Sequence, residues 1–388
     1  MNYDTNATQA AQRDLSFGLS LMAQLGAGNV PISPTSVRTA LAMLYEGARG
    51  ATARQIAQAA FLPEDANARQ AGFRELTDAL NAANTPYTLR CANGVWLAEK
   101  YPVNDDFRSV LTRSYKAEVQ AADFERNPEG ERAKINGWVS GKTDGKIPGL
   151  FPADSINQWT GFVLANALYF KAPWASKFNP QYTQKQGYTL SNGQNVQVDM
   201  MRKGAIESAG ELPEFQYGQF DGVQVVMLPY EGHQLAKIVM LPPKGSNVGS
   251  LEAHLKERNV SVADLSGRLR REKFARLEIP KHEVRGSYDL EAPLRAMGID
   301  GLFALATAEL SGIGSGPLFV NKGIHQTYFR TNEEGSEGAA ATGFSALRSM
   351  RIDMSIPIEF VADRPFLEAV VDINTGAVIF LNRIEDPR

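Results

Sequence analysis

The residues best suited to catalysis or metal binding are few in this chain, and none of them forms a familiar motif. The sequence has 388 residues, with four histidines and one cysteine. The histidines are His233, His254, His282 and His325, and none lies in an H-E-x-x-H motif. A single cysteine cannot form an internal disulfide or a cysteine-rich zinc site, and no G-x-S-x-G nucleophile motif is present. The sequence therefore predicts no enzyme activity, no bound metal and no cofactor.

Two further features could suggest chemistry, and both have a simpler explanation. Gly141-Lys142-Thr143 resembles the end of a phosphate-binding loop, but that loop needs a glycine where this chain has Asn136, and a strand before it. Residues 129–140 are instead predicted to be helical, so nucleotide binding is not expected. Cys91 lies in a predicted buried strand, which favours a small core residue over a reactive thiol.

One segment stands out for a different reason. Residues 333–352 follow a predicted strand and read EEGSEGAAATGFSALRSMRI, so small side chains dominate them. A connection of about 20 residues inside a compact domain is unusual and is often functional. The alternatives are a floppy loop or a short alanine-rich helix, and composition alone does not separate them.

The elements that must hold this segment are mostly helices early in the chain and mostly strands later. Ser33-Pro34-Thr35-Ser36 supplies hydroxyl groups that can cap a helix, and Asn374-Thr375-Gly376 is typical of a hairpin turn. Apolar periodicity predicts helices over residues 15–25, 37–46, 52–61, 70–81, 106–116 and 129–140. It predicts strands over 87–98, 117–124, 162–170, 186–201, 223–230, 234–241, 275–286, 318–331, 366–373 and 377–384. The predicted fold class is α+β, in one domain over residues 1–388.

Composition excludes two classes of partner. The net charge is −3, from 40 basic and 43 acidic residues, which argues against a general nucleic-acid binder or a membrane-surface protein. No apolar run is long enough to span a membrane, and no secretion signal is seen at the start. We therefore expect a cytoplasmic protein, although a secreted protein whose signal had been removed would look the same.

Several motifs in a fixed order resemble the serpin family of protease inhibitors, over nearly the whole chain. They are Ser33-Pro34-Thr35-Ser36-Val37 with Ala40-Leu41-Ala42-Met43 and Gly47-Ala48, Asn136-Gly137-Trp138-Val139 with Thr143-Asp144-Gly145-Lys146-Ile147, Leu164 to Trp174, and Asp363-Arg364-Pro365-Phe366. The resemblance, to a prokaryotic-type inhibitory serpin, implies early helices packed on three β-sheets with an exposed reactive loop at about 333–356.

The hinge that begins this loop carries the most specific resemblance. It comprises Glu333, Glu334, Gly335, Ser336, Glu337, Gly338, Ala339, Ala340, Ala341 and Thr342. The family usually has alanine at position 338, so Gly338 is expected to slow or weaken loop insertion. The C-terminal signature usually has an apolar residue at position 368, and the effect of Glu368 is expected to stay within its own strand.

The hinge also suits insertion on physical grounds alone. If the segment becomes a central strand, alternate residues share a face, and the first face is small and uncharged up to Phe344. That face comprises Ser336, Gly338, Ala340, Thr342, Phe344 and Ala346. The one charged side chain, Glu337, falls on the opposite face, which can stay in contact with water. Insertion would add roughly a dozen backbone hydrogen bonds at about 1 kcal/mol each.

The resemblance implies a suicide-substrate mechanism. A serine protease cleaves the loop and forms an acyl-enzyme, and the freed loop then inserts into the main sheet and traps the protease covalently. The chain itself is then an inhibitor, expected to be a monomer that can also form polymers. Arg348-Ser349 is the favoured scissile bond because arginine suits a trypsin-like pocket. Ser349-Met350 is the alternative, and it would suit an elastase-like or subtilisin-like protease.

The resemblance also implies residues that control the opening of the sheet. Ser33, Ser36, Asn166 and His325 are expected to hold the sheet shut near its centre. Lys281 and Glu333 are expected to form an ion pair beside Trp174, where the loop begins. A non-inhibitory serpin is the second interpretation, but bulky or charged hinge residues are typical of that class, and Ser336 to Thr342 is small apart from Glu337.

Overall fold

Two β-sheets form the frame of the computed structural model, which describes residues 5–207, 212–321, 323–336 and 356–388. The smaller, which we call the main sheet, has six strands in the order β11-β12-β13-β4-β2-β3. Only the β2–β3 neighbours are parallel among its described pairs. Its strands are β2 (Thr88–Ala98), β3 (Glu118–Ala122), β4 (Phe162–Pro173), β11 (His282–Asp289), β12 (Ile324–Thr331) and β13 (Gly335–Ser336).

The larger sheet has ten strands, in the order β1-β16-β15-β9-β8-β7-β10-β6-β5 with β14 also paired to β10. Strand β10 pairs with β7 at one end and with β6 at the other, so the second and third of the three expected sheets are continuous through it. The strands are β1 (Val30–Ile32), β5 (Gln184–Thr189), β6 (Asn195–Gly204), β7 (Glu214–Phe220), β8 (Val223–Pro229), β9 (Leu235–Leu241), β10 (Arg270–Pro280), β14 (Ile358–Val361), β15 (Phe366–Asp372) and β16 (Val378–Ile384).

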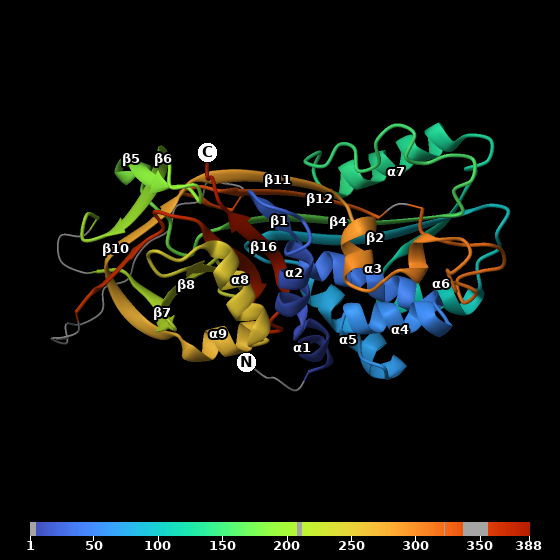
Figure 1. Cartoon of the computed structure of the whole chain (residues 1–388), viewed down its shortest axis with the longest axis horizontal. Coiled ribbons are helices and arrows are strands. Elements are labelled where there is room, and N and C mark those ends of the chain that lie inside the picture. The colour runs from blue at the N-terminus through green and yellow to red at the C-terminus, as the bar shows by residue number, and fades with distance from the viewer. Residues whose placement is uncertain (1–4, 208–211, 322, 337–355) are drawn as a thin grey trace.

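Helices cover both faces of the main sheet. Helix α7 lies across one face, and the early helices gather on the other side (Figure 1). The helices are α1 (Asn6–Ala11), α2 (Asp14–Met22), α3 (Pro34–Gly47), α4 (Gly50–Ala59), α5 (Ala66–Leu80), α6 (Asp105–Ser114), α7 (Pro128–Lys142), α8 (Val248–Glu257), α9 (Val262–Arg268) and α10 (Glu291–Ala296). None of the helices described is long and apolar enough to cross a membrane.

The predicted cap of α3 is confirmed, because the Ser33 side chain accepts a hydrogen bond from the Ser36 backbone N–H. The helix begins at Pro34, earlier than the predicted start at residue 37, since proline is well suited to a first helical turn. Helices α8, α9 and α10 lie in the later half, where the sequence analysis predicted mostly strands.

Two predicted strands are each divided into two elements, and a third, expected over 318–331, begins only at Ile324. The strand expected over 186–201 is a hairpin of β5 and β6, and Gly193 in its turn has a positive φ of 83°. The strand expected over 275–286 is divided between β10 and β11, which lie in different sheets. The chain changes sheets just after Pro280, and proline lacks the N–H group that a continuing ladder would need.

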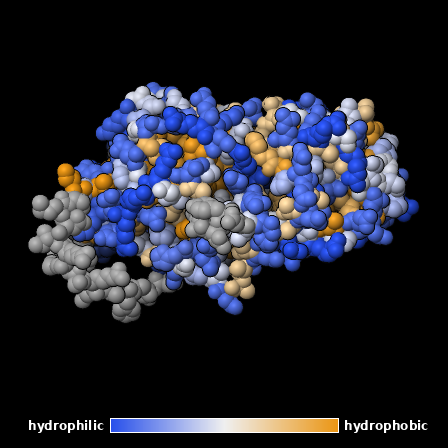
Figure 2. Space-filling model, turned by 90° about the horizontal axis from the view of Figure 1, so that it is seen from below, coloured by the Kyte–Doolittle hydropathy of each residue, from blue (hydrophilic) through white to orange (hydrophobic). Residues whose placement is uncertain are grey.

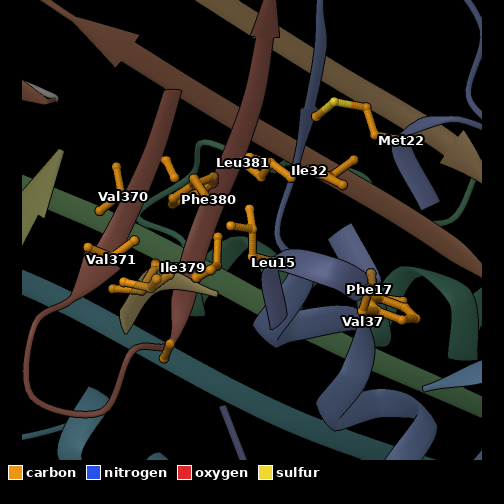
Figure 3. Close-up of a cluster of buried hydrophobic side chains, with 14 of the residues drawn as sticks. Leu15, Phe17, Met22, Ile32, Val37, Val370, Val371, Ile379, Phe380 and Leu381 are labelled. Carbon is orange, nitrogen blue, oxygen red and sulfur yellow. The ribbon is translucent and has the colours of Figure 1, made fainter. Parts of the chain in front are cut away.

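The core is continuous between the sheets and the early helices. Leu15 of α2 lies beside Ile379 and Leu381 of β16, and Val37 of α3 lies beside Phe17 of α2 (Figure 3); all five side chains are buried. Seen from below, the surface is mostly hydrophilic, with apolar side chains in small separate patches (Figure 2).

Candidate functional site

The first residues of the hinge already form a strand of the main sheet. Gly335 pairs with Pro173 of β4, and Ser336 pairs with Ala172 of β4 and with Thr331 of β12. The two residues, β13, therefore lie between β12 and β4. We call this point the mouth of the main sheet.

The two hinge residues in β13 are closely packed. The Ser336 side chain is 1% exposed, and its Oγ lies 2.6 Å from the Tyr230 hydroxyl oxygen. A Cβ atom on Gly335 would lie 2.1 Å from the carbonyl oxygen of Ala172, so only glycine fits there. Ser336 thus points inward, as the period-two argument predicted for the start of the small face.

Trp174, at the end of β4, fixes the backbone at the mouth. Its backbone N–H donates to the Glu334 carbonyl, and its indole N–H donates to the Asn332 carbonyl, each at 2.9 Å. Its ring stacks on Tyr230 with the centroids 4.6 Å apart and the planes 6° apart. The expected position of Trp174 beside the hinge is confirmed.

The predicted ion pair between Lys281 and Glu333 is also confirmed, with Nζ 3.1 Å from Oε2. The other carboxylate oxygen accepts a hydrogen bond from the Thr183 hydroxyl at 2.7 Å. Burial alone would raise the pKa of Glu333, but the hydrogen bonds from Thr183 and Lys281 lower it below its ordinary value. The carboxylate is therefore held in its charged form at the mouth.

Replacing Glu333 with lysine should weaken the mouth. The change removes two charge-assisted hydrogen bonds, worth about 2 kcal/mol or more together, and brings two ammonium groups together. We expect polymers to appear on a native gel at a lower heating temperature than for the parent chain. Glu334→Lys is the matched control, because Glu334 pairs with Lys177 at a more exposed position. Equal behaviour of the two variants would contradict a specific role for Glu333.

The four residues expected at the centre of the main sheet do meet, through the start of α3. The His325 ring on β12 accepts a hydrogen bond from the Ser33 backbone N–H at 3.0 Å. The Ser36 hydroxyl donates to the side-chain oxygen of Asn166 on β4. Among the residues that the structure describes, no hydrogen bond joins Asn166 to His325 directly. The start of α3 therefore connects the two strands that flank β13.

A small cavity of about 60 Å³ lies beside these residues, lined by Ser36, Asn166 and His325 together with apolar side chains. Burial lowers the pKa of His325 to about 4, so its ring is neutral at physiological pH and can accept the Ser33 hydrogen bond. An acid-induced charge on this ring would cost stability. The free energy of unfolding should therefore fall as the pH drops from about 6.5 toward about 4.

His325→Ala should loosen the centre of the sheet. The change removes the acceptor for the Ser33 N–H and enlarges the cavity, at a cost of about 2–4 kcal/mol. We expect more polymer, or more of the inactive latent form, after mild heating. His254→Ala is the control, since His254 lies in α8, where its Nε2 is 3.1 Å from an Asp221 carboxylate oxygen. Heating behaviour like that of the parent chain would contradict the gating role.

The sequence analysis missed a buried ionic cluster below the mouth. Lys237 of β9 and Glu368 of β15 form an ion pair of 2.7 Å, and both side chains are 0% exposed. The Lys237 ammonium also donates to the Thr331 hydroxyl, and the His282 ring lies 3.0 Å from Glu368. We call Lys237, His282 and Glu368 the mouth cluster. The expectation that Glu368 acts only within its own strand is wrong, because its carboxylate joins β15 to β9 and β11.

Electrostatics keep the Glu368 carboxylate of the mouth cluster charged. Burial would raise the pKa of Glu368, but Lys237 and His282 bring it well below its ordinary range. Burial lowers the pKa of Lys237, and the Glu368 carboxylate opposes this change. A lysine inside the apolar strand 235–241 and a glutamate inside 366–371 were the signals that could have revealed the cluster.

Several predicted site residues lie outside the described part of the chain. They are Glu337, Gly338, Ala339, Ala340, Ala341, Thr342, Arg348, Ser349 and Met350. The hinge departure at Gly338 and both candidate scissile bonds therefore stay predictions.

Cys91 and the Gly141-Lys142-Thr143 motif lie in surroundings that explain them without chemistry. Burial raises the pKa of the Cys91 thiol to about 11, which keeps it unreactive near neutral pH. No group of three or more histidine, cysteine, aspartate or glutamate side chains that could hold a metal ion occurs among the described residues. The helix predicted before Gly141 is present as α7, so the context of a phosphate-binding loop is absent there.

Comparison with known proteins connects this geometry to one family. A family model described as "Serpin (serine protease inhibitor)" matches residues 11–387. The leukocyte elastase inhibitor of Bos taurus is 34% identical over 378 residues, which cover 95% of this chain and 96% of that protein. An uncharacterized serpin-like protein of Thermococcus kodakarensis is 33% identical over 379 residues, covering 96% of this chain and 84% of that protein.

Solved structures agree with the sequence matches. A cleaved serpin, Serpin 42Da, superposes with a TM-score of 0.84 at 25% identity and covers 98% of this chain and 99% of its own. A serpin of the insect Tenebrio molitor superposes with a TM-score of 0.82 at 26% identity, and each chain is fully covered.

Proposed function

The chain belongs to the serpin family, and from this premise we propose that it inhibits a serine protease as a suicide substrate. The protease's serine hydroxyl attacks a carbonyl carbon in the loop after Ser336. An ester bond to the protease forms, the peptide bond breaks, and the new amino terminus leaves. The freed loop then continues β13 into the main sheet and carries the protease with it. Distortion of the oxyanion hole slows hydrolysis of the ester, since losing one donor costs about 10²–10³-fold.

The position of β13 carries the proposal. Gly335 and Ser336 lie between β12 and β4, and among the described residues no backbone pairing joins β12 directly to β4. A loop that continues past Ser336 in the same direction would gain hydrogen bonds from strands on both sides, at about 1 kcal/mol net each. Insertion would therefore supply the driving force for trapping.

The inward position of Ser336 supports an inhibitory serpin over a non-inhibitory one. Its side chain is buried against Tyr230, so each second residue after it would face the same interior. Those residues begin with Gly338, Ala340 and Thr342, which are small and uncharged.

For the target, we propose a trypsin-like protease that cleaves at Arg348-Ser349. Arginine fills a pocket with an acidic floor. Cleavage at Ser349-Met350 by an elastase-like protease is the second candidate, and the observation in its favour is the bovine relative named leukocyte elastase inhibitor.

Incubation with trypsin and with elastase, in parallel, tests both candidates. We expect trypsin to form a complex that survives boiling in detergent, and mass spectrometry of the released C-terminal peptide identifies the cleaved bond. Trypsin whose catalytic serine is replaced by alanine is the control, because it cannot form the ester. A complex with elastase alone would favour the second candidate. Cleavage with no stable complex by either protease would contradict inhibition and favour a non-inhibitory serpin.

A further inference from the structure

Phe61 occupies a backbone position at which glycine is usual. Helix α4 ends just before it, and two hydrogen bonds close the turn. The Phe61 N–H donates to the Gln58 carbonyl at 3.4 Å, and the next N–H, of Leu62, donates to the Ala57 carbonyl at 2.9 Å. This pattern places the residue after a helix in the left-handed region, which favours glycine or asparagine. Phe61 has a φ of 50°, and among the described non-glycine residues with a positive φ it is the only one with a hydrophobic side chain.

Packing in the core does not explain this aromatic side chain. Phe61 is 40% exposed, and the Arg13 guanidinium lies over its ring at 5.9 Å from the centre. An aromatic side chain held at the surface in an unfavourable backbone conformation is a form of local strain that is common at binding sites. Its ring lines a surface cavity of about 390 Å³, which is within the size range of small-molecule sites.

The polar wall of this cavity consists of amide and hydroxyl groups. Gln55 and Gln58 come from α4, Ser20 comes from α2, and Gln24 follows the end of α2. The Gln55 side-chain oxygen accepts a hydrogen bond from the Gly301 N–H at 2.9 Å, which fixes this amide and leaves its NH₂ group available. Within the part of the chain that the structure describes, the side chains of Gln24 and Gln58 form no hydrogen bond. The cavity therefore offers several donors and acceptors to a ligand.

Charge contributes little to this cavity. Among the described residues that line it, Lys256 of α8 is the only one with a charged side chain, and it is exposed. The same lining contains no carboxylate, histidine or cysteine, so the cavity suits neither a metal ion nor acid–base chemistry. A single exposed ammonium attracts an anion only weakly in water, so a phosphate or sulfate ligand is a poor match. The chemistry of the lining favours an uncharged ligand with many hydrogen-bonding groups.

We propose that this cavity, which we call the glutamine pocket, binds a neutral pyranose sugar. A pyranose carries hydroxyl groups that both donate and accept, and the side-chain amides and the Ser20 hydroxyl can match them in either direction. It also has a face of C–H groups that can pack on the Phe61 ring and against Met297, which also lines the pocket. None of the lining residues belongs to the mouth, so a bound sugar would hold the protein at a sugar-bearing surface while the loop stays available to a protease.

Saturation-transfer nuclear magnetic resonance with the methyl glycosides of glucose, galactose and mannose tests for binding directly. We expect transfer to the ring protons of at least one glycoside, with the same affinity at low and high salt, because hydrogen bonds and ring packing rather than charge hold the sugar. The absence of transfer to any of these glycosides would overturn the proposal. An affinity that falls as salt is added would also overturn it, because a charged group would then be holding the ligand.

Phe61→Asn and Gln58→Ala test whether the sugar lies in the glutamine pocket. Asparagine tolerates the left-handed backbone and alanine favours a helix, so both variants should unfold at the parent's denaturant concentration and still trap trypsin. The dissociation constant for the glycoside should rise at least about tenfold in each. Arg54→Ala is the matched control, because Arg54 is exposed one turn before Gln58 in α4 and does not line the pocket.

Parent-like affinity in Phe61→Asn and Gln58→Ala would overturn the proposal, and so would an equal loss in Arg54→Ala. If Phe61→Asn unfolds more easily than the parent, Gln58→Ala decides alone. Failure of the parent chain to trap any protease would overturn the proposed function and leave the sugar result unaffected.

Discussion

Ser336→Arg is expected to turn the inhibitor into a substrate. Ser336 is buried in β13 with its hydroxyl 2.6 Å from that of Tyr230, so an arginine here would place a charge at the start of the inserting strand. Burying an unpaired charge costs several kcal/mol, and insertion should slow until hydrolysis of the ester is faster. Recognition of the bait bond should be unchanged, because that bond lies farther along the loop.

The readout is the partition between covalent complex and cleaved inhibitor after incubation with trypsin. We expect the fraction trapped to fall by at least about tenfold while cleavage continues, since about 1.4 kcal/mol already changes a rate ratio tenfold. Ser336→Ala is the matched control: it loses the hydrogen bond to Tyr230 but buries no charge. If Ser336→Arg traps trypsin as well as the parent chain does, the insertion mechanism is wrong.

Lys237→Met should cause the largest loss of stability. The change leaves the Glu368 carboxylate fully buried without its ammonium partner, and breaking such a pair typically costs about 3–5 kcal/mol. The denaturant concentration at which the native state unfolds, followed by circular dichroism, should fall accordingly.

The double variant Lys237→Met with Glu368→Leu separates charge from shape. With both charges replaced by apolar side chains, neither the Lys237 ammonium nor the Glu368 carboxylate is left buried without its partner. We expect this variant to recover most of the lost stability. A double variant as unstable as Lys237→Met alone would show that the exact side-chain shapes, rather than the ionic pairing, hold the mouth together.

Local features of the fold could be predicted from the sequence because short-range chemistry determines them. The Ser33 cap and the turn at Asn374-Thr375-Gly376 each depend on a few adjacent residues, and both are present. The hairpin between β5 and β6 was missed although Asn192-Gly193 lies in its turn, because a run of strand-forming residues on both sides was treated as one element.

Contacts between residues far apart in sequence could be predicted only where a family motif contained those residues. The Lys281–Glu333 pair and the group around His325 followed from the resemblance, and the structure shows the contacts. The mouth cluster did not, because its members come from strands β9, β11 and β15, which are far apart in sequence. Only the packing of the two sheets brings them together.

Trp174, stacked on Tyr230, provides an intrinsic fluorescence signal at the mouth of the main sheet. Trp174 is one of four tryptophans, and it contacts the hinge backbone, a buried ammonium and a tyrosine ring at once. Trp96 and Trp138 pack against each other elsewhere in the molecule. Trp159 is 75% exposed, so a soluble quencher should selectively reduce the fluorescence of Trp159. With Trp159 quenched, a change in emission as the loop moves should come chiefly from Trp174, and seating of the hinge becomes visible in real time without any attached dye.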